Sequence, residues 1–400
     1  MVLFNSLIIR GNAEAFPPGC FKYMKKILFI VNVDKFFISH RLPIALECIA
    51  KGYEVHIACA FTGSEIYLQQ LGINTHAIPL TRAGVSIFKE IKAFIQIYKI
   101  ISLLRPDVVH MVTAKPVAYG GIACKLLGVN KRVASISGLG YAFIDNSLKA
   151  KLIKSIILIL YRFSLRNEKT NVIFQNANDK QLFIHHGIIN ESQSLIIRGS
   201  GVELNKYVVK PEPSGIPVVV FVSRLLYDKG IREFIAAVRL IKKSDINFRA
   251  VLVGNIDENP NSAKQHEINH WEAEGIVEYW GFREDIPHVL ALSNIVVLPS
   301  YREGLPKILI EAAACGRAVI TTDVPGCRDA ITPDETGLLV EVKDHLTLAQ
   351  AIKSLLNNPD LRHKMASSGR ELAEQSFDIN SVVQTHMEIY NSSSINFKDK

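Results

Sequence analysis

Cysteine is scarce in this chain, and its arrangement excludes both a disulfide framework and a cysteine-based metal or redox site. The 400 residues include six cysteines, which are scattered through the sequence, and no two of them form a C-x-x-C pair. Thiols in apolar stretches are typical of reduced core residues, so we expect a cytoplasmic protein. No Asp-x-Asp pair occurs either, and we expect no metal site and no cofactor.

Long apolar runs are also absent. No run approaches the roughly 18 residues that a helix needs to cross a bilayer. Residues 1–23 lack the basic start and the long apolar core of a signal peptide, and they show neither helical nor strand periodicity. Because Met24 precedes a strand-like apolar run, we expect residues 1–23 to be a disordered or dispensable extension. A chain shortened to Met24 should keep its function.

Acidic residues are sparse in the first half of the chain. Residues 1–205 carry 24 Lys and Arg against 12 Asp and Glu, a net charge of +12, whereas residues 206–400 carry 22 against 26, a net charge of −4. A basic half suits an anionic surface or an anionic substrate, and a solvated basic face is the plainer alternative. No arginine-rich arm or nucleic-acid-binding module accompanies the charge, so we expect no nucleic-acid partner.

Apolar runs that alternate with helical patterns are abundant, and 48% of the residues are hydrophobic. This alternation predicts parallel sheets with crossover helices. The strand candidates are 26–33, 54–59, 107–112, 132–137, 171–175, 194–198, 217–223, 248–254, 277–281, 295–299 and 318–322. The helix candidates are 40–51, 86–104, 116–127, 147–168, 177–186, 230–243, 285–293, 306–315, 345–357, 359–375 and 379–391.

A proline-rich stretch, residues 210–215, separates the two series of elements. We therefore predict an α/β protein of two doubly wound, Rossmann-like domains. Such domains would face each other across a cleft at the carboxyl ends of their sheets. The expected division is a first domain over 24–209, a second over 210–376 and a final segment over 377–400.

One stretch of the second series combines features that suit an anionic ligand. Gly304 permits a sharp turn and a close approach of backbone to a ligand, and Pro306 suits the first position of the following helix. The start of that helix offers free N–H groups and the positive end of a dipole to a diphosphate. Glu303 and Glu311 flank this point with seven residues between them, and carboxylates accept hydrogen bonds from sugar hydroxyls. The stretch therefore suits a nucleotide sugar.

Two cations precede this stretch in the sequence. Arg224 and Lys229 lie between the end of strand 217–223 and the next helix. That end faces the expected cleft, where two positive charges can balance a diphosphate and the charge that develops as it leaves. Surface cations at a helix start are the alternative, but cations are disfavoured at the positive end of a helix dipole.

Together these residues resemble a known family. Glu303 to Glu311 is similar to the E-x7-E signature of retaining GT-B glycosyltransferases of family four, and Ser223 to Gly230 is similar to that family's diphosphate-binding Arg and Lys segment. Both stand in the family's order, and the resemblance extends from about Lys25 to the last helix. It implies the two-domain GT-B fold, in which the final segment returns to the first domain.

The resemblance implies a role for each matched residue. Arg224 and Lys229 would bind the donor diphosphate and act in catalysis, Glu303 would lie beside the donor sugar, and Glu311 would bind the ribose hydroxyls. The backbone of the turn and two strand-end glycines complete the expected donor site: Gly304, Leu305, Pro306, Gly254 and Gly281. For the two strand-end glycines, a plain turn is an equal alternative.

The loop after the first strand differs from the Gly-Gly pair that is usual in the family. Its Asp34 and the run from Ser39 to Pro43 resemble a bacterial subgroup that acts on lipid-linked oligosaccharide, O-antigen and capsule intermediates. On this basis Asp34, His40 and Arg41 would contact hydroxyls and phosphate of the acceptor. Helix capping by Ser39 with a solvated turn is the alternative.

Two further segments are candidates for the cleft face of the first domain. His110 stands near the end of its strand where the family has His-x-His, and we count it with the catalytic candidates, although a lone histidine also suits a core. The second histidine, which often contacts the donor sugar in the family, is missing, and Thr113 or Lys115 could take its role. Lys115 is also a candidate for the acceptor side. Gly138 and Gly140 follow the next strand and indicate a close-approach loop in the acceptor pocket.

The resemblance implies transfer of a hexose or N-acetylhexosamine from a nucleoside-diphosphate sugar, with UDP the expected nucleotide. The acceptor would be a hydroxyl of a polyprenyl-diphosphate-linked saccharide in surface polysaccharide synthesis. The resemblance also implies retention of the anomeric configuration. No metal ion is expected, because Arg224 and Lys229 can replace its positive charge. Two alternatives stay open: an epimerase or hydrolase of nucleotide sugars with the same fold, and a non-catalytic scaffold that binds sugar or lipid.

Two stretches, residues 86–105 and 148–166, combine apolar and basic side chains. Such helices can lie on an anionic bilayer, and ordinary core helices with solvated faces are the alternative. With a lipid-linked acceptor, this pattern predicts a peripheral protein at the inner face of the cytoplasmic membrane.

Overall fold

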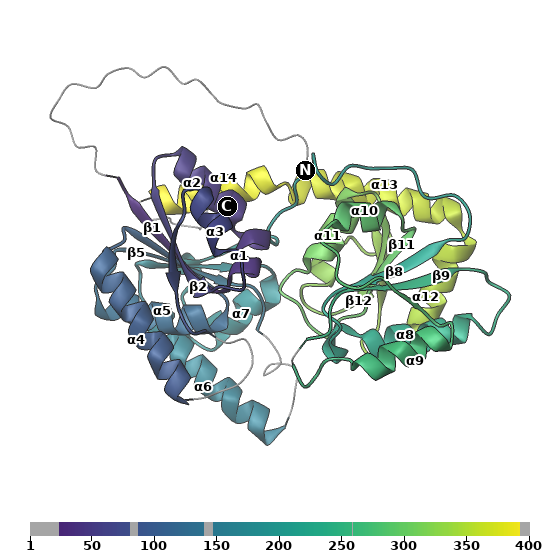
Figure 1. Cartoon of the computed structure of the whole chain (residues 1–400), viewed down its shortest axis with the longest axis horizontal. Helices are drawn as coiled ribbons and strands as arrows, with labels where there is room; N and C mark the ends of the chain where they lie inside the picture. Colours follow the sequence, from purple (N-terminus) through teal and green to yellow (C-terminus); the bar gives the residue numbers. More distant parts are fainter. Residues whose placement is uncertain (1–23, 81–86, 140–146, 258, 393–400) are drawn as a thin grey trace, which may run out of the picture.

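The structure, a computed structural model, describes residues 24–80, 87–139, 147–257 and 259–392. They form two lobes side by side, each built on one parallel sheet (Figure 1). The two sheets confirm the prediction of two doubly wound α/β domains. The predicted extension, residues 1–23, and Gly140 lie outside the described residues.

The first lobe contains seven parallel strands in the order β3-β2-β1-β4-β5-β6-β7. Helices α4 to α7 cover one face of this sheet, and α1, α2 and the C-terminal α14 cover the other. The strands are β1 Lys26–Val33, β2 Glu54–Ala60, β3 Asn74–Ala77, β4 Val108–Val112, β5 Lys131–Ile136, β6 Thr170–Phe174 and β7 Ser194–Ile196. The helices are α1 Asp34–His40, α2 Leu42–Ala50, α3 Glu65–Gln70, α4 Ile87–Leu104, α5 Ala114–Leu126, α6 Leu148–Leu165 and α7 Ala177–His185.

The second lobe contains six parallel strands in the order β10-β9-β8-β11-β12-β13. Its strands are almost entirely apolar because both faces of the sheet are covered. The strands are β8 Val218–Val222, β9 Arg249–Val253, β10 Glu278–Tyr279, β11 Ile295–Leu298, β12 Ala318–Thr322 and β13 Gly337–Val340. The helices are α8 Ile231–Ile241, α9 Gln265–Ala273, α10 Ile286–Ala291, α11 Lys307–Ala314, α12 His345–Asn357 and α13 Pro359–Ser376, and the chain ends with α14 Ile379–Asn391 on the first lobe.

The chain crosses between the lobes twice, and the two crossings lie against each other. The Val202 N–H donates to the Phe377 carbonyl at 2.8 Å, and the Ile379 N–H donates to the Val202 carbonyl at 3.1 Å. After the second crossing, α14 packs on α2 and buries Met387 and Tyr390 in the core of the first lobe. The last helix therefore belongs to the first lobe in space, as Figure 1 shows along the top of the molecule.

Each sheet has a point at which the strand order reverses. β1 lies between β2 and β4 in the first sheet, and β8 lies between β9 and β11 in the second. Ligands of doubly wound proteins bind outside the carboxyl ends of the strands at such points. The loops that follow β8 and β11, and those that follow β1 and β4, are therefore where a site is expected.

The structure adds short elements that the sequence pattern did not predict, namely α1, α3, β3, α9 and β13. It also corrects the role of Pro306, which is the extended residue before the helix (φ −72°, ψ 123°) and not the first helical residue. Within the described residues, no helix is long and apolar enough to span a bilayer.

Candidate active site

Neighbouring strands of the second sheet bring the predicted donor residues together. Arg224 follows β8 and Glu303 follows β11, and these strands pair directly in the sheet. Lys229 ends a short 3-10 turn, Tyr227–Lys229, that leads into α8. The Lys229 ammonium forms an ion pair with the Glu303 carboxylate, which also accepts a 2.8 Å hydrogen bond from the Ser300 hydroxyl. Both charged side chains are mostly buried, so the pair is a fixed feature of the fold.

Asp228 links this pair electrostatically to Arg224. Burial raises the pKa of the Asp228 carboxyl, the Lys229 and Arg224 cations lower it, and Glu303 raises it. All of these charges therefore lie within electrostatic range of one carboxyl group. Arg224 is more exposed than Lys229 and donates from Nη1 to the Asp257 carboxylate at 3.0 Å. An anion that approaches this end of the sheet meets two cations.

The turn that carries Glu303 is pressed against the first lobe. A Cβ added at Gly304 would lie 2.6 Å from the Ser137 carbonyl oxygen, so only glycine fits there. The Asn176 amide of the first lobe donates to the Gly304 carbonyl at 2.8 Å. Next to the turn, Arg302 forms an ion pair with the buried Asp179 of α7. The geometry of Glu303 therefore depends on contacts from both lobes.

Leu305 and Pro306 join this turn to α11. Leu305 is buried, and it lies against Gly199 of the first crossing, where a Cβ would come within 2.9 Å of the leucine side chain. Pro306 has no N–H to lose before the helix starts. The first N–H groups of α11, which have no partner within the helix, therefore follow directly in sequence after the turn that carries Glu303.

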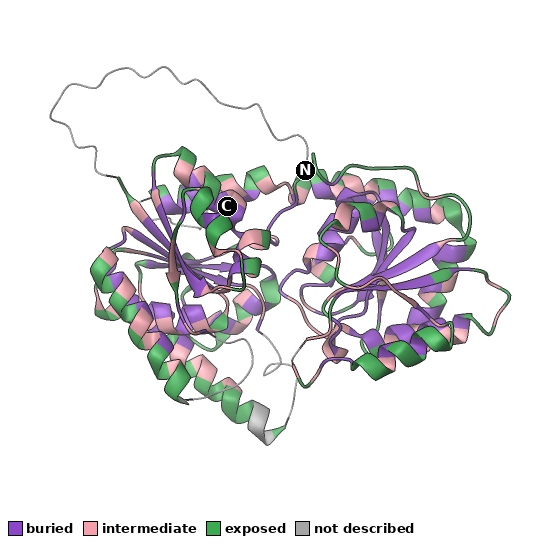
Figure 2. Ribbon diagram, viewed as in Figure 1, coloured by how far each residue is buried: buried purple, intermediate pink, exposed green. Residues whose placement is uncertain are grey.

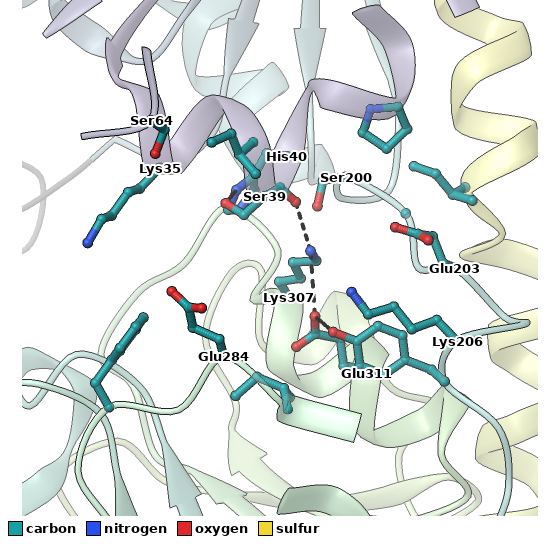
Figure 3. Close-up of a pocket in the computed structure, with 17 residues that line it drawn as sticks. Lys35, Ser39, His40, Ser64, Ser200, Glu203, Lys206, Glu284, Lys307 and Glu311 are labelled. Carbon is teal, nitrogen blue, oxygen red and sulfur yellow. Dashed lines mark hydrogen bonds and ion pairs between the residues drawn. The ribbon is translucent and has the colours of Figure 1, made fainter. Parts of the chain in front are cut away.

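Glu311 lies one and a half turns into α11, away from the Lys229 pair, and it borders a cavity of about 410 Å³ between the lobes. Tyr207 donates to Glu311 Oε1 at 2.5 Å, and Lys307 Nζ lies 3.5 Å from the same oxygen. Burial raises the pKa of the Glu311 carboxyl, although Lys307 and the Tyr207 hydrogen bond act in the opposite direction. Lys307 also donates to the Ser39 carbonyl of the first lobe at 2.7 Å, so it bridges the lobes (Figure 3).

The cavity is lined from three sides: by α1 of the first lobe, by the first crossing and by the second lobe. Figure 3 shows polar and charged side chains pointing into it from all three. It includes Glu311 but not Lys229 or Glu303, which lie outside its lining. The labelled residues are Lys35, Ser39, His40, Ser64, Ser200, Glu203, Lys206, Glu284, Lys307 and Glu311.

Two strand-end glycines were predicted near the nucleotide base, and they differ in their surroundings. Gly254 has φ 145°, and a Cβ there would come within 1.8 Å of the Ser223 carbonyl oxygen, so this glycine permits close packing of two strand ends. Gly281 has φ 68° and open space around its Cα. Gly281 therefore leaves room next to Phe282, which lines the cavity.

Comparison with known proteins identifies the family. Models of group 1 glycosyl transferases and of glycosyl transferase 4-like proteins match residues 205–372 and 26–176. A relative from Campylobacter jejuni, N,N'-diacetylbacillosaminyl-diphospho-undecaprenol alpha-1,3-N-acetylgalactosaminyltransferase, is 30% identical over 378 residues, which cover 91% of this chain and 98% of the relative. The chain belongs to the group 1 glycosyltransferases.

Further matches place this glycosyltransferase among GT-B enzymes. The Escherichia coli UDP-Gal:alpha-D-GlcNAc-diphosphoundecaprenol alpha-1,3-galactosyltransferase is 25% identical over 305 residues, which cover 73% of this chain and 77% of the relative. The crystal structure of Anabaena HepE in complex with UDP and glucose superposes with a TM-score of 0.73 at 21% identity, covering 92% of this chain and all of HepE. The expected GT-B fold is confirmed.

Two of the predicted acceptor contacts of this glycosyltransferase, Asp34 and Arg41, are buried in the structure. The buried Asp34 carboxylate accepts hydrogen bonds from the Thr62 N–H, the Thr62 hydroxyl and the Ser64 N–H at 2.6 to 3.0 Å. Burial alone would raise the pKa of Asp34, but these bonds hold it below its ordinary value. Arg41 is only 2% exposed, and burial lowers its pKa to about 10. Asp34 therefore serves the fold of the first lobe, whereas the buried Arg41 Nε has no hydrogen-bond partner among the described residues, and its acceptor contact stays a prediction.

His110 is also a core residue in the structure. Its ring is fully buried, with Nδ1 hydrogen-bonded to the Tyr390 hydroxyl at 2.6 Å and Nε2 to the Ser135 hydroxyl at 2.7 Å. Burial, followed by the positive charge of Arg41, holds the pKa of His110 well below its ordinary value. Both ring nitrogens are engaged within the first lobe, which favours a core role, and the catalytic role of His110 stays a prediction.

The remaining acceptor candidates lie in different environments. His40 lines the cavity and its ring stacks on Phe36 with centroids 4.1 Å apart. Lys115 forms a 2.6 Å ion pair with Glu90, which balances its charge within the first lobe. Gly138 has φ 117°, and a Cβ there would lie 3.2 Å from the Gly304 N. The loop after β5 therefore meets the Glu303 turn, and its place in an acceptor pocket stays a prediction.

Three polar side chains stand at neighbouring strand ends, and the sequence pattern predicted a role for Thr113 but none for Asn32 or Ser137. Thr113 Oγ1, Asn32 Oδ1 and Ser137 Oγ have no hydrogen-bond partner among the described residues. They follow or end β1, β4 and β5, which are adjacent in the sheet. Thr113 has φ 77°, a strained conformation for a β-branched residue. Strain and unpaired polar atoms at the switch point are typical of a ligand-binding edge.

Other residues of the site had little or no signal in the sequence. Lys307 stands four residues before Glu311 in a helix, a spacing from which the ion pair could have been predicted. Tyr207 and Arg302 carry no such pattern, because their partners lie 104 and 123 residues away in sequence.

Proposed function

We propose that this glycosyltransferase moves a hexose or N-acetylhexosamine from a UDP-sugar to a hydroxyl of a polyprenyl-diphosphate-linked saccharide. The two relatives named above act on undecaprenyl-diphosphate-linked sugars by their names, and they support this acceptor class. Synthesis of a surface polysaccharide is the corresponding role. The observation that carries the proposal is the Lys229–Glu303 pair beside Arg224, at the strand ends that face the first lobe.

In the proposed donor complex, the diphosphate lies between Arg224, Lys229 and the start of α11. Charge-assisted hydrogen bonds from these cations would stabilise the diphosphate more as it leaves than in the intact donor. Glu303, held by Ser300, would accept hydrogen bonds from the donor sugar. Glu311 would accept hydrogen bonds from the ribose hydroxyls through Oε2, since Tyr207 donates to Oε1. The nucleotide base would then lie toward Gly281.

We further propose retention of configuration without a metal ion. Retention through two inversions requires a nucleophilic carboxylate under the anomeric carbon. Glu303 is paired with Lys229, and Glu311 is tied to Tyr207 and Lys307, so both carboxylates have binding roles. In a same-face reaction the bond from the anomeric carbon to the diphosphate oxygen breaks, the acceptor oxygen bonds on the same face, and the departing phosphate takes the acceptor proton. Arg224 and Lys229 would supply the positive charge that a divalent ion supplies elsewhere.

On the acceptor side we propose the edge formed by Asn32, Thr113 and Ser137, with His40 nearer the cavity. Hydroxyl and amide groups without partners suit the hydroxyls of a saccharide, and a buried polar atom without a partner is costly until a ligand satisfies it. The proposed acceptor is lipid-linked, so we also propose that the protein works as a peripheral protein at the inner face of the cytoplasmic membrane.

The test is a panel of nucleotide sugars offered with a polyprenyl-diphosphate-linked acceptor, with nucleotide release and product anomeric configuration as readouts. We expect release that depends on acceptor, an unchanged anomeric configuration and full activity in excess EDTA. Release without acceptor would indicate a hydrolase, and inversion or loss of activity in EDTA would refute the proposed mechanism. Glu303→Gln should lose turnover, whereas Glu371→Gln, a change at an exposed position of α13, is the matched control and should retain most of it.

A further inference from the structure

Helix α4 presents a stripe of large apolar side chains to solvent. Its inner side is buried in the first lobe through Ala93, Ile97 and Ile101. On its outer side, exposed apolar residues recur three and four positions apart, which places them in one line along the helix. The outer residues are Phe88, Ile91, Ile95 and Tyr98, with Leu103 exposed near the helix end.

Helix α6 repeats this arrangement. Tyr161 and Leu165 are buried in the same core as the inner side of α4. The opposite side again exposes large apolar residues at helical spacing, and Ile159 is 68% exposed. The outer residues are Leu152, Ile153, Ile156, Ile159 and Phe163.

The two stripes lie on the same side of the first lobe. Both helices pack against α5 and cover the same face of the sheet, whereas α14 covers the opposite face. Figures 1 and 2 show α4 and α6 at the lower left of the molecule, with much of their surface exposed. At roughly 150–250 Å² for a fully exposed large side chain, the ten side chains expose on the order of 1,000 Å² of apolar surface. About half of this area lies on each helix, so each stripe alone matches the roughly 300–600 Å² of the largest patch on a typical monomer.

Basic side chains accompany the stripes, and acidic ones do not. Lys89, Lys92 and Lys99 are exposed on α4, as are Lys151 and Arg162 on α6. The two helix sequences contain one acidic residue, which turns inward and accepts hydrogen bonds from a lysine and a tyrosine of α5; it is Glu90. The exposed face therefore combines apolar stripes with positive charge only.

We propose that the α4–α6 face inserts its apolar stripes into the headgroup region of an anionic bilayer. This inference rests on the proposed function, because a lipid-linked acceptor requires the protein to reach a membrane. It adds which surface makes the contact and how: the apolar side chains insert into the bilayer, beyond electrostatic attraction to it. Basic residues beside the stripes match anionic headgroups. A second copy of the chain fits less well, because a two-fold contact would bring like charges together.

The first test measures binding to vesicles of phosphatidylglycerol and phosphatidylcholine by flotation. The pair Ile156→Gln and Ile159→Gln should lower the partition coefficient by about tenfold or more, because two half-exposed apolar side chains no longer enter the bilayer. The matched control is the pair Ile66→Gln and Leu346→Gln, which are 70% and 56% exposed on α3 and α12. An equal loss in both pairs would overturn the proposal.

The second test reports insertion directly. Phe88→Trp should be quenched by lipids brominated on their acyl chains, whereas Tyr67→Trp on α3 should not. Each signal is taken as the difference from the parent protein, whose Trp271 and Trp280 lie in the second lobe. No quenching of Phe88→Trp while the protein is vesicle-bound would overturn insertion. So would a dimer of the parent protein that the Ile156 and Ile159 pair converts to a monomer, because a second copy would then cover the face.

Failure of this inference can be told apart from failure of the proposed function. The glutamine pair on α6 should turn over a short-chain, water-soluble acceptor at the parent rate and lose turnover with acceptor in vesicles. A parent protein that binds vesicles through this face but transfers sugar to neither acceptor would leave the surface standing and refute the function.

Discussion

The substitution Arg302→Met tests how the turn that carries Glu303 is held against the first lobe. Arg302 pairs with Asp179, whose side chain is 1% exposed, and its own side chain is 17% exposed. Removal of one partner of a buried ion pair costs about 3–5 kcal/mol, because the other charge is left uncompensated. The Asn176 amide still donates to Asp179 at 3.2 Å, so we expect the lower end, about 3 kcal/mol, at neutral pH.

The effect of Arg302→Met should depend on pH in a defined direction. Burial raises the pKa of Asp179 above 3.8 more strongly than Arg302 and Asn176 lower it. A carboxyl whose pKa is raised by folding binds protons more tightly in the folded state, so stability falls as pH rises from the unfolded to the folded pKa. Loss of Arg302 raises the folded pKa further. The loss of unfolding free energy should therefore be complete above the pKa that Asp179 has in the folded variant. It should shrink as the pH falls through that pKa, because a protonated carboxyl needs no counter-charge.

Urea unfolding at pH 7.5 and pH 5 and initial rates of transfer measure both consequences. Because Glu303 follows Arg302, a shifted turn should also reduce kcat by about 10- to 100-fold. The control is Arg249→Met, which breaks the exposed pair with Glu278 and should change stability by less than about 1 kcal/mol. A loss in Arg302→Met no larger than in the control, or one that grows towards acid pH, would refute the reasoning.

Three further predictions follow from single side chains of the structure. Lys229→Ala should lower kcat by about 100- to 1,000-fold in initial-rate assays, since a charge that meets the leaving diphosphate is lost; a loss confined to KM would contradict that role. Tyr207→Phe should raise KM for the donor by about tenfold and leave kcat nearly unchanged, because a hydrogen bond to the buried Glu311 is removed, and an unchanged KM would show that Glu311 does not touch the donor. His110→Phe should lower the free energy of unfolding by about 2 kcal/mol, since Tyr390 and Ser135 lose their partner; intact kcat in the folded variant checks that it is a core residue.

The meeting of the proposed donor residues could be predicted from sequence because strand order determines it. Arg224 follows one strand and Glu303 follows another, and the reversal of strand order places these strands side by side. Charged residues that follow two neighbouring strands lie close together because the strands pair, and no contact from a distant segment is required. The Lys229–Glu303 pair is the result.

The surroundings of the proposed acceptor residues could not be predicted in the same way, because distant segments of the chain form hydrogen bonds with their side chains. His110 reads as a strand-end histidine, but Tyr390 arrives 280 residues later on α14 and occupies one ring nitrogen. Asp34 reads as a loop carboxylate, but Thr62 and Ser64 from the loop after β2 take up its oxygens. The periodicity of a sequence predicts which face of a helix or strand is buried. It does not predict which distant side chain will form hydrogen bonds with a polar residue on that face.

Residues that contact the first lobe alternate with residues that face the proposed donor in the ten positions from 302 to 311. Arg302, Gly304 and Lys307 each contact the first lobe, through Asp179, Asn176 and Ser39. Glu303 and Glu311 lie between or beyond these contacts and face the proposed sugar and ribose. The same short segment would therefore set both how the donor is held and how far its sugar stands from the acceptor lobe. Changes to the lobe contacts of Arg302 and Gly304 should then act mainly on kcat, since they misplace the reacting sugar, whereas changes at Tyr207 and Glu311 should act mainly on donor KM.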